Sequence, residues 1–77
     1  MTSIAIGPEG NLFAADFYNH RVQKFSPDGT FLTDFGSKGA GASQFEHALA
    51  VAVADDGSVL AADLGNHRIQ KWRLAEP

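Results

Sequence analysis

The chain has 77 residues, no cysteine, and six basic against nine acidic residues. A chain of this length buries only about 60% of its unfolded surface, and without cysteine neither disulfides nor cysteine-based zinc sites can compensate. The mild negative charge and the scattered basic residues argue against a nucleic-acid partner, and no apolar run approaches the roughly 20 residues of a membrane-spanning helix.

The first residues lead directly into an alternating apolar stretch and lack the charged and hydrophobic regions of a signal peptide. We therefore expect either a cytoplasmic protein or a segment of a longer chain, and the sequence does not assign a compartment.

Four short strands are predicted in the first half of the chain, at Ile4–Ile6, Leu12–Ala15, Arg21–Phe25 and Thr30–Phe35. Turn residues separate them, with a glycine at position 10 that suits a positive φ and a Ser-Pro-Asp-Gly hairpin signal at 26–29. Short strands joined by tight connections predict a four-stranded antiparallel meander, which is one blade of a β-propeller.

The second half repeats the first. Residues 4–25 align without a gap on residues 51–72, at an offset of 47 residues, and ten of these 22 positions are identical. A glycine-containing connection over 35–48 precedes three further strands, predicted at Leu49–Val53, Val59–Ala62 and Arg68–Leu74. The prediction is thus an all-β propeller fragment of seven strands, with one blade and its connection at 1–48 and a second blade, lacking its outer strand, at 49–77.

Two segments carry a family resemblance: Asp63 with Asn66-His67-Arg68-Ile69-Gln70-Lys71-Trp72, and the matching segment that begins at Asp16. Together with Gln44-Phe45 before the second inner strand, they resemble the NHL repeat. The resemblance implies a six-bladed propeller and no single function, because relatives include protein-binding modules, RNA-binding domains, sensor domains and a zinc-dependent amidating lyase. Glu46-His47-Ala48 departs from the Pro-x-Gly that relatives usually carry there.

Two blades cannot close a ring, and they leave apolar sheet faces uncovered. Closed cyclic symmetry removes this problem, so we expect three copies to form a six-bladed homotrimer. The rival hypothesis is a truncated piece of a longer propeller. Four or eight blades would also divide evenly among two-blade chains.

The repeated polar residues have two interpretations. As a ligand site they would present His20 and His67 to a partner; as a structural motif, Asp16, Asn19 and Arg21, repeated as Asp63, Asn66 and Arg68, would hold each blade together. We favour the structural interpretation, in which Asp pairs with Arg, Asn adopts the left-handed turn conformation and His caps the backbone.

Two further groups of candidates are not repeated residues. Phe17 and Tyr18 lie in the first polar turn, and they either contact a partner or, for Phe17, pack on the next blade. His47 directly precedes an inner strand, and its His-x-Leu segment resembles the metal-ligand segment of the amidating lyase. Three copies would bring three imidazoles together, which is a known zinc arrangement, although a solvent-facing loop histidine is the simpler interpretation.

No catalytic residue is predicted, because the serines lack a patterned histidine partner. Glu9, Asp28, Asp55 and Asp56 are interpreted as ordinary turn residues beside glycine. The function that we expect is a self-assembling module that binds a protein or a small molecule. A zinc-dependent lyase-like or hydrolase-like enzyme, centred on His47, is the alternative.

Overall fold

A computed structural model describes residues 3–73 of the chain, and within them it contains two antiparallel sheets and no α-helix. The first sheet, in repeat 1, has the order β1-β2-β3-β4, formed by β1 (Ser3–Ile6), β2 (Leu12–Asp16), β3 (Arg21–Phe25) and β4 (Phe31–Phe35). A single 3-10 turn, η1 (Phe17–Asn19), joins β2 to β3. The predicted meander is confirmed, and its strand ends differ from the prediction by at most one residue.

The second sheet, in repeat 2, has the order β5-β6-β7, formed by β5 (Ala48–Val53), β6 (Val59–Asp63) and β7 (Arg68–Trp72). The last predicted strand ends at Trp72 in the structure, and residue 74 lies outside the described residues. Tight turns close each hairpin. Gly10, Gly29 and Gly57 have φ between 86° and 90°, which is the reason for glycine at these corners.

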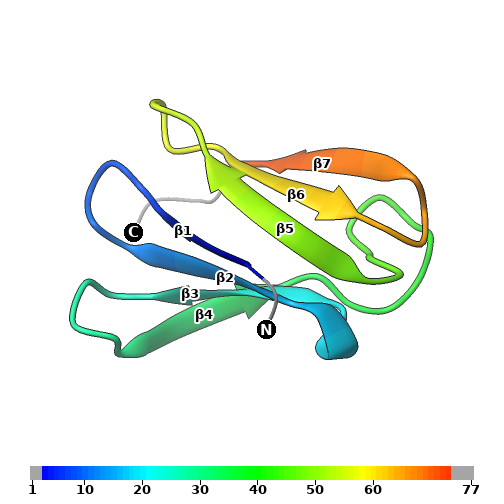
Figure 1. Cartoon of the computed structure of the whole chain (residues 1–77), viewed down its shortest axis with the longest axis horizontal. Coiled ribbons are helices and arrows are strands. Elements are labelled where there is room, and N and C mark those ends of the chain that lie inside the picture. Colours follow the sequence, from blue (N-terminus) through cyan, green and yellow to red (C-terminus); the bar gives the residue numbers. More distant parts are fainter. Residues whose placement is uncertain (1–2, 74–77) are drawn as a thin grey trace.

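The two sheets lie face to face, and β5 runs alongside β1 (Figure 1). In each repeat, alternate residues point to two faces. The front face carries Ile4 and Leu12 in repeat 1 and the equivalent Val51 and Val59 in repeat 2. The back face is the opposite one, and it carries Val22 in repeat 1 and the equivalent Ile69 in repeat 2. The back face of repeat 1 packs on the front face of repeat 2, and the core lies between them. Its buried residues are Phe13, Ala15, Val22, Phe45, Ala48, Val51, Val59 and Ala61.

A connecting segment, residues 36–47, carries the chain from β4 to β5 and folds back on itself. The backbone of Lys38 and Phe45 forms an isolated parallel bridge, and Phe45 is fully buried against Trp72. Gly36 has φ 99° and approaches the Phe45 ring so closely that a Cβ would lie 2.6 Å from it. The segment thus belongs to the core as well as to the chain path. No helix in the described residues is long and apolar enough to cross a membrane.

Candidate functional site

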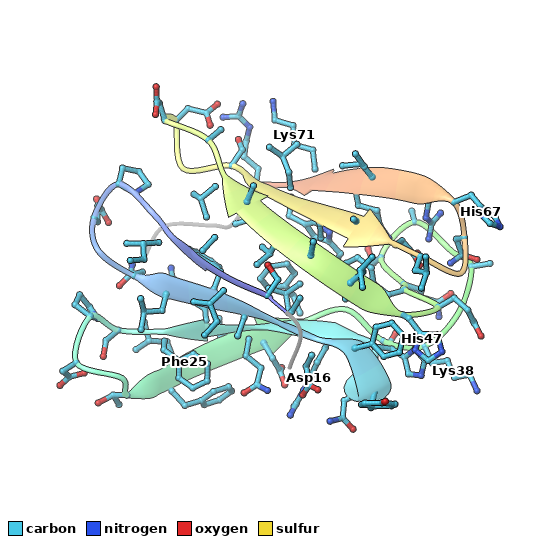
Figure 2. All side chains as sticks on the ribbon, in the orientation of Figure 1. Asp16, Phe25, Lys38, His47, His67 and Lys71 are labelled. Atoms are coloured by element: carbon cyan, nitrogen blue, oxygen red, sulfur yellow. The ribbon has the colours of Figure 1, made fainter. Side chains whose placement is uncertain are left out.

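The polar residues of both repeats gather at one end of the molecule. The β2–β3 turn, the β6–β7 turn and the connecting segment all lie there, as Figure 1 shows, and the labelled side chains of Lys38, His47 and His67 in Figure 2 come from these parts. Asp16 is the last residue of β2, directly before the first of these turns. The β1–β2 and β5–β6 turns lie at the opposite end.

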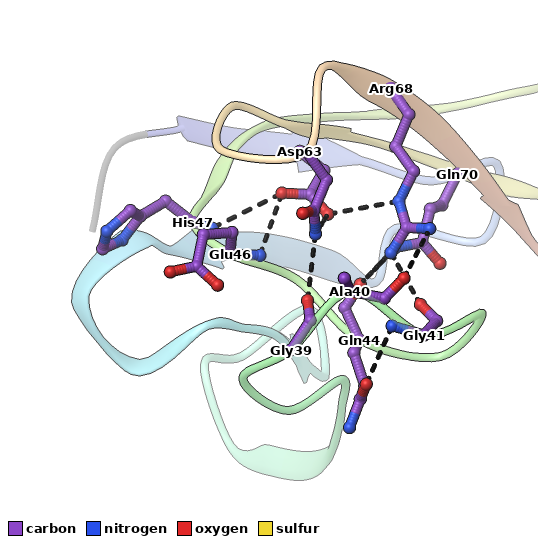
Figure 3. Close-up of polar contacts among 10 residues, drawn as sticks. Gly39, Ala40, Gly41, Gln44, Glu46, His47, Asp63, Arg68 and Gln70 are labelled. Carbon is purple, nitrogen blue, oxygen red and sulfur yellow. Dashed lines mark hydrogen bonds and ion pairs between the residues drawn. The ribbon is translucent and has the colours of Figure 1, made fainter.

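The centre of this end in repeat 2 is a buried carboxylate. Asp63 is fully buried, and its Oδ2 accepts hydrogen bonds from Nδ2 of Asn66 at 2.8 Å and from Nε of Arg68 at 3.3 Å. Its Oδ1 faces the start of β5 and accepts from the backbone N–H groups of Glu46 at 3.0 Å and His47 at 3.5 Å (Figure 3). Asp63 therefore ties the β6–β7 turn to the end of the connecting segment.

The donors around Asp63 also hold the connecting segment by its carbonyl groups. Nη2 of Arg68 donates to the carbonyl oxygens of Gly41 at 2.6 Å and Gln44 at 2.7 Å, and Gln70 donates to the same Gln44 oxygen at 2.6 Å. Arg68 Nη1 reaches Ala40 at 3.3 Å, and Asn66 reaches Gly39 at 2.9 Å (Figure 3). Asp63, Asn66, Arg68 and Gln70 form what we call the Asp63 cluster, and its function in this chain is to dock residues 39–47.

Repeat 1 contains the same constellation without a docked segment. Asp16 Oδ2 accepts from Asn19 at 3.0 Å, Arg21 at 3.2 Å and Gln23 at 2.9 Å; we call these four residues the Asp16 cluster. Among residues 3–73, its one side-chain hydrogen bond to another residue runs from Arg21 to Asp34 on β4, at 2.7 Å. The Asn and Arg Nε contacts to the carboxylate are thus the same in both repeats, whereas the glutamine differs: Gln23 donates to Asp16, and Gln70 donates to the docked segment.

Both carboxyl groups stay ionised to low pH. Burial raises the pKa of Asp16, but hydrogen bonds from Asn19, Arg21 and Gln23 outweigh it and hold the pKa below its ordinary value. For Asp63 the same balance holds: burial raises the pKa, and the Asn66 amide and the backbone N–H groups that face Oδ1 lower it further than burial raises it. The site is therefore anionic at its centre and presents N–H donors at its rim.

The structure corrects two expectations about these turns. The left-handed residue is the histidine and not the asparagine: φ is 54° at His20 and 52° at His67, while Asn19 and Asn66 use their side chains to hold the aspartates. Among residues 3–73, neither histidine side chain caps the backbone. His67 is exposed, and Nδ1 of His20 is buried without a hydrogen-bond partner among the described residues.

The aromatic residues of the first turn divide between two environments. The Phe17 ring stacks on the His47 ring, with centroids 4.3 Å apart, so Phe17 packs against the beginning of repeat 2. Tyr18 is 78% exposed and is free to contact a partner. Nδ1 of His47 lies 3.0 Å from the Phe17 carbonyl oxygen, to which it donates, and the His20 ring lies 4.5 Å from that of His47.

Within one chain, residues 3–73 contain no group of three side chains that could hold a metal ion. His47 is the one predicted ligand there. Its Nδ1–H is fixed by a backbone carbonyl, which leaves Nε2 as the acceptor, an orientation that metal-bound histidines share.

Sequence reasoning missed a cavity at the opposite end of the molecule. It has a volume of about 260 Å³ and lies between the β1–β2 and β5–β6 turns. Phe13 and Val53 are apolar residues of its lining, Nζ of Lys24 lies 5.8 Å from the Phe13 ring centroid, and Glu9, Asp55 and Asp56 are the acidic residues of the lining. The lining residues are Gly7, Pro8, Glu9, Asn11, Phe13, Lys24, Val53, Asp55, Asp56 and Gly57. They come from both repeats, so no local pattern could have signalled them.

Comparison with known proteins agrees with this geometry. The sequence profile of the NHL repeat matches residues 2–25 and 45–72, which together are most of the chain. Two sheets that pack face to face, each centred on the same aspartate turn, define a β-propeller-type scaffold for binding proteins or ligands. The chain belongs to the NHL repeat family. No curated protein matches it.

Proposed function

We propose that the chain is a self-assembling propeller module. Three copies pack head to tail into a six-bladed ring that offers its loops to a protein or a small-molecule ligand, without catalysis of its own. The chain supplies two successive blades to this ring, and the surface between its own two repeats is the template for the surface between copies.

One comparison within the molecule carries the proposal. Val22, on the covered back face of repeat 1, is completely buried, whereas the equivalent Ile69 of repeat 2 is 71% exposed. On the front face the order reverses: Val51 is 8% exposed, and the equivalent Ile4 is 63% exposed. Repeat 1 therefore leaves its front face open, repeat 2 leaves its back face open, and both open faces are apolar.

Open faces of this kind favour repetition of the same contact. The back face of repeat 2 has a shallow apolar depression of about 170 Å³, lined by Ala50, Val51, Ala52, Leu60, Ala62 and Ile69. The front face of repeat 1 offers Ile4 and Ile6, the latter 69% exposed. Because the contact joins two different faces, it is heterologous, and it closes into a ring when the rotation per blade divides a full turn.

The test uses two variants that each block one face. Ile69→Lys should block the back face of repeat 2, and Ile4→Lys the front face of repeat 1. Thr30→Lys, in the exposed β3–β4 turn, is the control. In sedimentation equilibrium we expect the unmodified chain and the control near three times 8.2 kDa, about 25 kDa, and each blocking variant near 8.2 kDa.

Mixing the two blocking variants makes the test directional. Each retains the face that the other has lost, so a heterologous contact predicts a one-to-one complex that grows no further. If like faces contacted each other, the two variants would not form a complex with one another. A compact monomer of the unmodified chain at high concentration, or a mass that corresponds to two or four copies, would overturn the six-bladed trimer.

A second candidate function is a zinc-dependent enzyme with three copies of His47 around the ring axis. The Phe17 carbonyl that fixes Nδ1 of His47 favours it, because Nε2 is then available to a metal. The test is zinc content after dialysis of the assembled protein. One zinc per three chains, lost in His47→Gln, supports the site, and the same content in the variant rejects it.

A further inference from the structure

The connecting segment has a docking surface in repeat 2, and repeat 1 carries a copy of that surface. Asp16, Asn19, Arg21 and Gln23 correspond to Asp63, Asn66, Arg68 and Gln70 at the offset of 47 residues. In repeat 2, six backbone groups of residues 39–47 bind these side chains. In repeat 1, Asp34 accepts from Nη1 of Arg21, the place that Ala40 takes on Arg68, and no backbone group of the described residues binds the side chains of the Asp16 cluster in the other places.

We propose that the Asp16 cluster, together with Phe25, is a binding site that accepts, as a separate peptide, a glycine-rich segment that ends in Gln-Phe-Gly. The segment would lie on repeat 1 as residues 39–45 lie on repeat 2. A second copy of this chain does not supply it, because its own connecting segment is already held by its own Asp63 cluster.

The hydrogen-bonding groups of the site define the backbone of the ligand. Asn19, Arg21 and Gln23 present N–H donors, so the segment must turn several carbonyl oxygens toward them, as Gly39, Ala40, Gly41 and Gln44 do in repeat 2. Oδ1 of Asp16 accepts no hydrogen bond from residues 3–73, and it suits the two successive backbone N–H groups that follow the phenylalanine, as on Asp63.

The glycines and the glutamine of the ligand follow from the shape of the docked segment. Gly39 has φ 149°, and a Cβ there would overlap the Gln44 side chain. Gln44 in turn closes the loop, since its Oε1 accepts from the backbone N–H of Gly41 at 2.8 Å. A segment without these residues could not turn its carbonyl groups to one side in so short a span.

The phenylalanine is the apolar anchor. In repeat 2, the buried Phe45 ring stacks on Trp72, with centroids 5.9 Å apart. The residue equivalent to Trp72 in repeat 1 is Phe25, which lies beside Leu12 on the open front face and is only partly buried. A phenylalanine side chain in the docked segment would cover Phe25 as Phe45 covers Trp72.

The residue after the phenylalanine sets the specificity. In repeat 2 this residue is Glu46, whose side chain packs so closely on Gly65 that a Cβ at position 65 would overlap it. The equivalent of Gly65 in repeat 1 is Tyr18, which has a Cβ. A ligand with glutamate at this position therefore collides with Tyr18, whereas glycine removes the colliding atoms. The site prefers Gln-Phe-Gly over the Gln-Phe-Glu of the chain's own segment.

The experiment titrates the full chain with a synthetic, fluorescently labelled peptide of residues 37–47 in which position 46 is glycine, and it follows fluorescence anisotropy. The chain carries Ile69→Lys, so that failure of assembly and failure of docking are separate results. We expect saturable binding by about 1 mM peptide. Peptides with glutamate at position 46, or with alanine in place of phenylalanine 45, should bind about ten-fold more weakly or worse.

Variants of the chain locate the site. Arg21→Lys keeps the charge but removes the guanidinium fork, and we expect about ten-fold weaker binding; Arg73→Lys, on an exposed ion pair elsewhere, should leave binding unchanged. Gln23→Ala serves as the second variant if Arg21→Lys does not fold. Equal binding of the glycine and glutamate peptides, no binding at the highest concentration, or unaltered binding by folded Arg21→Lys or Gln23→Ala would overturn the proposal.

Discussion

The two aspartates at the centre of the repeated motif provide a test of the docking geometry, because the same substitution should have very different costs at the two positions. Asp63→Asn and Asp16→Asn both replace one carboxylate oxygen by an NH₂ group. At Asp63 both oxygens accept two hydrogen bonds each. Whichever way the new amide turns, its NH₂ group faces two donors.

The cost at position 63 follows from those contacts. Two hydrogen bonds to a buried charge are lost, and the two groups that donated them now face the NH₂ group, which is itself a donor. We therefore expect about 3–5 kcal/mol of destabilisation. At position 16, all three donors address Oδ2. The amide can place its oxygen there and its NH₂ at the Oδ1 position, which accepts nothing from residues 3–73, so we expect about 1 kcal/mol.

Urea unfolding followed by circular dichroism measures the difference, at a protein concentration held constant for both variants. A larger shift of the midpoint for Asp63→Asn than for Asp16→Asn, or loss of folding in Asp63→Asn alone, agrees with the docked segment as the cause. Equal shifts would refute it, because the motif would then act only within each repeat.

Three further outcomes follow. Because the pKa of Asp63 lies lower in the folded than in the unfolded chain, the unfolded chain binds more protons in acid, so stability should fall as the pH decreases below about 5; a flat urea midpoint between pH 6 and pH 3 contradicts this. Gly36→Ala should cost about 2 kcal/mol or more in thermal unfolding, since φ is 99° and the new Cβ meets the Phe45 ring. In dilute monomer, Val22→Ala should cost about 2 kcal/mol and the equivalent Ile69→Ala less than about 0.5, and similar losses would show that Ile69 is covered within one chain.

Much of the fold could be predicted from local pattern. Period-two alternation gave the strand Arg21–Phe25 without error, and glycines beside acidic residues marked hairpin turns with positive φ at Gly10, Gly29 and Gly57. The 47-residue repeat indicated two blades with one motif, and the Asp–Arg pairs of that motif are present in both. Which turn residue takes the left-handed conformation was predicted wrongly, because the aspartate recruits the asparagine side chain and leaves His20 and His67 to make the corner.

The contacts between the repeats could not be predicted in this way. Gln70 is a repeated residue, but nothing in the residues around it indicates that it donates a hydrogen bond to the Gln44 carbonyl, 26 positions earlier. The stacking of Phe17 on His47 and the cavity between the two hairpin turns also join residues about 30 or more positions apart. The local sequence around one partner does not indicate which distant residue it contacts.

The sequence by itself determined the strands, their antiparallel order within each repeat, and the family, because each depends on neighbouring residues and on a repeat that is visible in the letters. Only the tertiary structure decided which faces are covered and which of two identical polar clusters is occupied. The physical reason is that burial and docking belong to pairs of elements: Val22 and Ile69 hold the same place in their repeats, yet only Val22 has a sheet packed against it.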